Sequence, residues 1–285
     1  MKKILVPIDF SPNSKNALWV AAEIAAKSGA RLELLHVNVA TIYSTPPEYA
    51  RAVAHVEDPE YDESAIAALE KLSLELSENP VFAKLKIDMR VEDGFLHTSI
   101  REVSEVDTVD LVVMGTKGAS GLKEFLIGSN TEKVIRTAPC PVLVVPEGVE
   151  RLDVKTVLLP STLKDDQQGI FRYLAKWQKI FGFTVKVLYL NNPAGFPTDG
   201  SAEAMKNRLA EAAGLEKPDV VMTMSAFFED STILSAAEHY DADMIAMATH
   251  QRQGLSHVLF GSVTEDTINH SKLPVLAVPV RWTES

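Results

Sequence analysis

The sequence predicts an α/β protein made of two tandem doubly wound domains, each a five-stranded, mostly parallel sheet with helices on both faces. Three observations support this prediction. Short, solidly apolar runs alternate with helical patterns along the whole chain, as expected for parallel strands covered on both sides. The second half of the chain repeats the first, and a glycine-spaced loop follows the fourth apolar run of the first half.

The repeat is visible by direct alignment. Residues 114–146 match residues 247–279 at a constant offset of 133, and the chain start matches at an offset of 153, from Pro7 to Pro160. The offset falls by 20 between the start and the end of the repeat, so the first copy carries about 20 extra residues in its middle. We assign them to residues 38–62. Two units of ordinary domain size follow, with expected bounds of 1–147 and 152–282.

In the first half, the helix after the first strand has clear start and stop residues. Ser11 is the expected N-cap, Pro12 the first helical residue, and Gly29 the terminator. Further helices are expected near residues 62–76, 96–106 and 129–137. The expected strands are Lys3–Ile8, Arg31–Val37, Leu85–Val91, Asp110–Gly115 and Val142–Val145.

The second half repeats this order of strands and helices. Its expected strands lie near Thr156–Leu159, Thr184–Tyr189, Val220–Met224, Met244–Ala248 and Val275–Val278.

Composition limits the classes of function. The chain has 285 residues and a net charge of −11, with no basic stripe, so nucleic acid is not an expected partner. Its one cysteine, Cys140, excludes an internal disulfide and suits a reducing compartment. No apolar run is long enough to cross a membrane, and the chain starts with a strand. We therefore expect a cytoplasmic protein without a membrane partner.

The loop from Gly115 to Ser129 has the pattern of a phosphate site. It follows an apolar strand and leads into a helix, so backbone N–H groups and the helix dipole favour an anion there. Glycines at Gly115 and Gly118 would let the backbone come close to a ligand. In parallel sheets, ligands bind outside the carboxyl strand ends where the strand order reverses. Asp9 and Gly115 both end strands, so we expect them to share one crevice.

These residues resemble the ATP-binding type of the universal stress protein family. The resemblance rests on Val6–Ser11, on Leu34–Val37, and on the Gly-x2-Gly-x9-Gly-Ser motif that runs from Gly115 to Ser129. It covers nearly the whole chain as a tandem pair. It implies an ATP-binding stress-response protein that acts as a nucleotide-dependent regulatory or interaction module, with one site in the first domain and an unidentified protein partner.

The resemblance also implies roles for individual residues. Asp9 would accept hydrogen bonds from the adenine or ribose end, with Pro7 and Ile8 as the wall. The Val37 backbone would hold the adenine edge, and Met114 would line the base or ribose. The residues expected around the ribose and phosphates are Gly115, Lys117, Gly118, Gly128, Ser129, Asn130 and Thr131. The hydroxyls of Ser129 and Thr131 also suit a Mg²⁺ ion bound with the nucleotide.

The second half departs from this motif. Ala248 replaces Gly115, Gln251 replaces Gly118, and Thr162 stands where Asp9 stood. We therefore expect no ATP there, while a different ligand remains open.

Several alternatives can be weighed from the sequence. The motifs of P-loop NTPases and of dinucleotide oxidoreductases are absent. A scaffold protein with vestigial nucleotide sites remains the alternative function. His36 is expected to be a packed core residue, and no convincing metal-ligand set is present.

No nucleophile with a positioned base is evident. We therefore expect no efficient enzyme, and at most slow ATP hydrolysis or autophosphorylation at Ser129 or Thr131. In the family, final strands pair between subunits. We therefore expect residues 142–145 to pair with residues 275–278 as an internal pseudo-dimer; further homodimerisation stays open.

Overall fold

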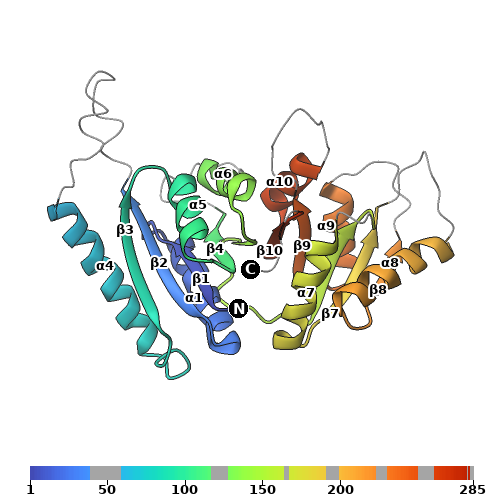
Figure 1. The fold of residues 1–285 in the computed structure, drawn as a ribbon, viewed down its shortest axis with the longest axis horizontal. Coiled ribbons are helices and arrows are strands. Elements are labelled where there is room, and N and C mark those ends of the chain that lie inside the picture. Colours follow the sequence, from blue (N-terminus) through green and yellow to red (C-terminus); the bar gives the residue numbers. More distant parts are fainter. Residues whose placement is uncertain are drawn as a thin grey trace, which may run out of the picture.

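A computed structural model describes residues 1–38, 59–116, 128–163, 167–190, 199–222, 230–249, 260–280 and 282. The strands are β1 (Lys3–Pro7), β2 (Arg31–Asn38), β3 (Ile87–Asp93), β4 (Leu111–Gly115), β5 (Val142–Val145), β6 (Thr156–Ser161), β7 (Thr184–Tyr189), β8 (Asp219–Met222), β9 (Met244–Thr249) and β10 (Val275–Pro279). They form one continuous ten-stranded sheet in the order β3-β2-β1-β4-β5-β10-β9-β6-β7-β8 (Figure 1).

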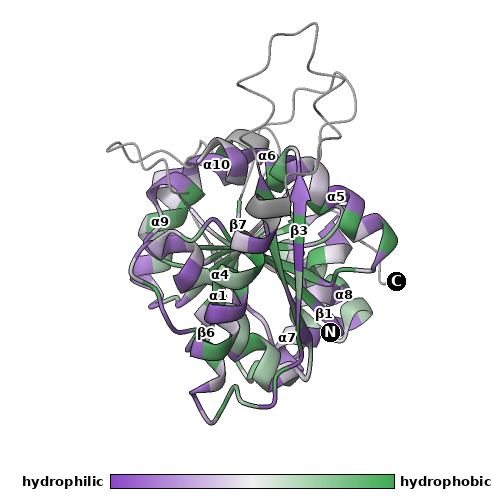
Figure 2. Ribbon diagram, turned by 90° about the vertical axis from the view of Figure 1, so that its left-hand side faces the viewer, coloured by the Kyte–Doolittle hydropathy of each residue, from purple (hydrophilic) through white to green (hydrophobic). Residues whose placement is uncertain are grey.

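The helices cover both faces of this sheet. They are α1 (Pro12–Ser28), α4 (Pro59–Ser77), α5 (Leu96–Val106), α6 (Ser129–Thr137), α7 (Gln168–Phe181), α8 (Asp199–Ala213), α9 (Asp230–His239) and α10 (Phe260–His270). Residues of α1, α4, α7 and α8 pack into one buried cluster, and residues of α5, α6, α9 and α10 pack into another on the opposite face. Figure 2 shows the apolar strands at the centre, with hydrophilic residues spread over the surrounding helices. The predicted α/β architecture is confirmed.

The strand pairing confirms the internal repeat. Ile4 of β1 pairs with Leu111 of β4, and their equivalents Val157 and Met244 pair in the same way in the second half. The equivalence extends to the strand starts. The Asp110 carboxylate accepts from the backbone N–H groups of residues 2 and 3, and the Asp243 carboxylate accepts from those of residues 155 and 156.

The two halves join through the expected pair of strands. All strand pairs within each half are parallel, whereas β5 and β10 pair antiparallel. Leu143 lies opposite Leu276, and these two residues are equivalent in the repeat. A pseudo-twofold axis therefore passes through this pair.

Side chains from both halves reinforce the junction. Arg136 on α6 donates two hydrogen bonds, of 2.6 and 2.7 Å, to the Glu265 carboxylate on α10. On the opposite face of the sheet, the Tyr173 hydroxyl donates to the Asp110 carbonyl at 3.2 Å. The Glu23 carboxylate of α1 accepts from the Leu152 N–H at 2.7 Å, just after the first half. The antiparallel strands are therefore supported on both faces.

The first helix begins and ends as the sequence predicts. The Ser11 hydroxyl accepts a hydrogen bond from the Ser14 N–H, and Pro12 is the first helical residue. At the other end, Gly29 has a φ of 73°, and its N–H donates to the Ala25 carbonyl. This left-handed conformation explains the glycine. By contrast, β3 begins two residues later than predicted, because the Leu85 N–H is used in a turn with the Phe82 carbonyl.

A buried ion network holds the edge of the first half together. Lys3 and Glu33 are 4% and 3% exposed and form an ion pair between β1 and β2. Arg90 of β3 contacts the Glu33 carboxylate at 2.6 Å and the Asp107 carboxylate, at the end of α5, at 2.9 Å. Lys3 also contacts Asp107 at 3.2 Å. Three strands and one helix therefore share a single network of charges. Among the described helices, none combines the length and apolar character that crossing a membrane requires.

Candidate functional site

The carboxyl ends of β1 and β4 meet at the place where the strand order reverses. β1 lies between β2 and β4, so the chain leaves β1 toward one side of the sheet and returns to β4 on the other. Asp9 follows β1, and Gly115 is the last residue of β4. The structure therefore brings Asp9 and Gly115 to the same edge of the sheet, at the position where open α/β sheets bind ligands.

The turn after β1 is braced by two aromatic rings. Asp9 is exposed, and its Oδ1 accepts a hydrogen bond from the Ser11 N–H at 3.0 Å. Phe10 has a φ of 62°, in the left-handed region that non-glycine residues seldom adopt. Its ring lies 4.8 Å from the His36 ring. The His36 Nδ1–H donates to the Ile8 carbonyl at 2.7 Å, since a carbonyl can only accept.

His36 and Phe10 are the residues that sequence reasoning missed. His36 was expected to pack in the core, but the structure places it half-buried against the strained turn. A histidine in an apolar strand carries no sequence sign of such a partner, because Ile8 and Phe10 approach only when β1 and β2 pair. This bracing holds the Asp9 carboxylate at the edge of the sheet.

The end of β2 offers backbone groups at the same edge. The β1–β2 pairing ends at Leu35, whose carbonyl accepts from the Ile8 N–H at 2.8 Å. In a parallel strand, alternate residues direct their N–H and C=O groups to the same side. The N–H and C=O groups of Val37 therefore point in the same direction as those of Leu35, toward the edge of the sheet just beyond the end of β1. Pro7 and Ile8 are buried below them.

Gly115 lies in close contact with the first turn of α1. A Cβ atom on this residue would lie 3.0 Å from the Asn13 carbonyl oxygen and 3.1 Å from the Asn13 Cβ, in the first turn of α1. Its neighbour Met114 is only 5% exposed and packs in the core between the sheet and helices α5 and α6. Gly115 therefore leaves room for the first turn of α1. The expected contacts of Gly115 and Met114 with a nucleotide stay predictions.

The base of the glycine loop is closed by hydrogen bonds. The Gly128 N–H donates to the Thr116 carbonyl at 2.8 Å, and the Thr131 hydroxyl donates to the Gly115 carbonyl at 3.1 Å. Thr131 is 3% exposed. Its hydroxyl proton therefore joins α6 to the end of β4, and its expected phosphate contact stays a prediction. Lys117 and Gly118 lie outside the described residues.

The start of α6 presents backbone donors at this edge. Gly128 is the N-cap and has no side chain to satisfy the N–H groups of the first turn. Ser129 and Asn130 follow it, and both are exposed. Glu132, in the same turn, is paired with Arg136 at 2.8 Å. The exposed helix start can therefore accept an anion, as the helix dipole favours.

The second half keeps the positive-φ turn after its first strand but lacks the carboxylate found there in the first half. Leu163, equivalent to Phe10, also has a positive φ, of 56°. In place of Ile8 stands Ser161, whose hydroxyl accepts from the Leu163 N–H at 3.0 Å and contacts the buried Gln167 side chain. Thr162 replaces Asp9, so no carboxylate follows β6. Gln251 lies outside the described residues.

The sequence matches the universal stress protein family over residues 1–146 and again over residues 154–279. The chain belongs to the universal stress protein family. It is a tandem member, because two copies of the family domain follow each other in one chain.

Relatives and solved structures agree with this assignment. A universal stress protein of Methanocaldococcus jannaschii is 33% identical over 145 residues, which cover 50% of this chain and 81% of the relative. The crystal structure of a universal stress protein from Archaeoglobus fulgidus superposes with a TM-score of 0.71 at 20% identity, covering 97% of this chain and 96% of that one. The tandem fold is therefore shared.

A second Archaeoglobus fulgidus universal stress protein was solved in complex with dAMP. It covers 45% of this chain and 99% of its own, at 18% identity and a TM-score of 0.33. Its complex with dAMP is a property of that protein.

Proposed function

We propose that the first half binds one adenine nucleotide, ATP, and that the protein acts as a nucleotide-dependent regulatory or interaction module in a stress response. One observation carries the proposal: the exposed Asp9 carboxylate and the uncapped start of α6 lie at the same reversal point of the sheet. A carboxylate suits the hydroxyls and amine of a nucleoside, and a helix start suits its phosphates.

Each part of the nucleotide has a proposed set of contacts. Asp9 and the backbone of Val37 take the adenosine end, above a wall formed by Pro7 and Ile8. The N–H groups of the first turn of α6 and the Ser129 hydroxyl take the phosphates, and Mg²⁺ would be bound together with them. The other proposed members of the phosphate loop are Gly115, Lys117, Gly118, Gly128 and Asn130, with Thr131 holding the loop base.

The proposal assigns different roles to the two halves. We place the domains at residues 1–147 and 152–282, and we assign no ATP to the second because Thr162 supplies no carboxylate where Asp9 stands in the first. Binding without efficient turnover is proposed, since no base is positioned beside a nucleophile in the motif. A cytoplasmic location and a protein partner complete the proposal.

The decisive experiment measures bound nucleotide. The protein is purified without added nucleotide, denatured, and its supernatant is resolved by ion-exchange chromatography, beside a calorimetric titration with ATP. We expect about one adenine nucleotide per chain.

Two matched variants localise the site. Asp9→Ala should lose nucleotide binding, whereas Thr162→Ala, at the equivalent position of the second half, should keep it. About two nucleotides per chain would contradict the assignment of the second half. No nucleotide and no titration heat would instead favour a scaffold protein with vestigial sites.

A further inference from the structure

A cluster of three basic side chains lies where α5 and α6 pack together. His97 is in the first turn of α5, Arg101 follows one turn later on the same helix, and Lys133 lies on α6. Burial lowers the pKa of His97, and the nearby positive charges of Lys133 and Arg101 lower it further. Lys133 and Arg101 therefore both lie within electrostatic range of His97, although the three residues come from two helices.

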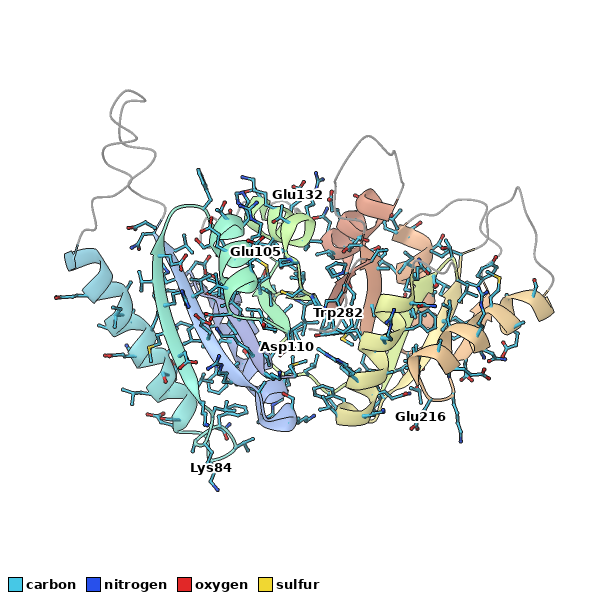
Figure 3. All side chains as sticks on the ribbon, in the orientation of Figure 1. Lys84, Glu105, Asp110, Glu132, Glu216 and Trp282 are labelled. Atoms are coloured by element: carbon cyan, nitrogen blue, oxygen red, sulfur yellow. The ribbon has the colours of Figure 1, made fainter. Side chains whose placement is uncertain are left out.

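Acidic side chains on the same helices do not neutralise this cluster. Glu132 precedes Lys133 but forms its ion pair with Arg136. Glu102 and Glu105 lie on α5 and are exposed; Figure 3 labels Glu105 and Glu132 on their helices. Within the described parts of the chain, none of the ion pairs includes His97, Arg101 or Lys133. The positive charges of Arg101 and Lys133 therefore have no counter-ion among the described residues and favour an external anion, which would in turn favour the protonated form of His97.

The cluster continues directly from the proposed phosphate position. Ser129 and Lys133 are four residues apart on α6 and both are exposed, so they share one face of that helix. One helical turn spans about 5.4 Å. Because helix side chains lean toward the N-terminus of their helix, the Lys133 ammonium can extend toward phosphates bound at the N–H groups around Ser129, and His97 of the neighbouring helix lies within electrostatic range of Lys133.

The second half provides an internal comparison. Helices α5 and α9 are equivalent in the repeat, because they end in the same way. The Asp107 N–H donates to the Val103 carbonyl in the first half, and at an offset of 133 the Tyr240 N–H donates to the Ala236 carbonyl. At the same offset of 133, the three basic positions become Asp230, Leu234 and Asp266.

The charge of the cluster is thereby reversed in the half that lacks Asp9. Asp230 instead contacts His270 Nδ1 at 2.6 Å. The fold does not require basic residues at these positions, because the second half forms the same two helices without them.

We propose that His97, Arg101 and Lys133 hold the terminal phosphates of the bound nucleotide, so that the first half selects ligands by phosphate number and prefers ATP to AMP. This inference rests on the proposed nucleotide site. It adds a specificity element on α5 and α6 to the contacts assigned above.

The test compares ATP and AMP by calorimetry on the full-length chain. His97→Gln and Lys133→Gln should each weaken ATP binding about tenfold, the loss expected for one charge-assisted hydrogen bond, and leave AMP binding within about twofold. Lys84→Gln is the matched control, since Lys84 is an exposed lysine at the opposite end of the first half (Figure 3). It should change neither affinity.

A spectroscopic readout separates a direct contact from a structural effect. The pKa of His97, followed by proton NMR, should rise when ATP binds and stay unchanged when AMP binds, because only the longer phosphate chain brings negative charge to the ring. Equal losses for ATP and AMP, or no loss for either, would overturn the inference while leaving the nucleotide site intact. Failure of the unmodified protein to bind either nucleotide would overturn both proposals.

Discussion

The pairing of Leu143 with Leu276 predicts an energetic coupling between the two halves. Both side chains are fully buried and lie opposite each other in the central antiparallel pair. Replacing either leucine by alanine removes three buried carbon atoms and leaves a cavity, at a cost of about 3 kcal/mol in the free energy of unfolding. Because the cavities adjoin, the double variant should depart from additivity by about 0.5–3 kcal/mol.

The assay is urea unfolding followed by far-ultraviolet circular dichroism. Leu34→Ala is the matched control: Leu34 is equally buried but lies on β2, three strands from β5, or about 14 Å away at the usual strand spacing. Combined with Leu143→Ala, it should give additive losses within about 0.5 kcal/mol. A loss below about 1 kcal/mol for Leu276→Ala, or additivity of the Leu143 and Leu276 variants, would refute the shared core.

Two further predictions concern titratable groups. The hydrogen bond from Lys3, aided by the charges of Lys3, Arg90 and Arg31, lowers the pKa of Asp107; its contribution to stability is therefore present above the unfolded-state pKa and lost as the pH falls through the lowered folded-state pKa. Asp107→Asn should destabilise the protein at pH 7 and flatten its loss of stability in acid, measured as unfolding midpoints against pH; an unchanged profile would count against the network. Burial raises the pKa of the Cys140 thiol to about 12, so the folded protein should resist iodoacetamide at pH 8 and react fully after denaturation, as mass spectrometry can show.

The fold could be predicted because its evidence is local or repeated. Apolar runs mark buried strands wherever they pair, and the cap residues Ser11 and Gly29 act within a few residues of themselves. The pairing of β5 with β10 was implied by the family resemblance, in which final strands pair between subunits, and it covers two equivalent apolar edges.

The contacts of the individual site residues could not be predicted from the sequence, because they join segments that lie far apart in the chain. The close approach of Asn13 to Gly115 could not be predicted from the sequence, because the two residues meet only when α1 packs beside β4. The same holds for Thr131, whose hydroxyl bonds to a carbonyl 16 residues earlier in the chain. The positive φ of Phe10 likewise depends on a ring from β2. Spacing along the chain predicted that Asp9 and Gly115 share one edge of the sheet, but it did not predict these contacts.

The two halves are joined in one chain but carry different residues at equivalent positions. In a dimer of identical domains, both crevices would carry the same residues, and a substitution in one crevice would also be present in the other. Here the strained turn is kept in both halves, at Phe10 and Leu163, whereas the charges around it differ. The sheet is formed by both halves, while the proposed ligand needs only one. The second half presents an acidic residue, Asp266, at the position where the first half presents Lys133, so α6 and α10, the two equivalent helices beside the central junction, carry opposite charges at this position.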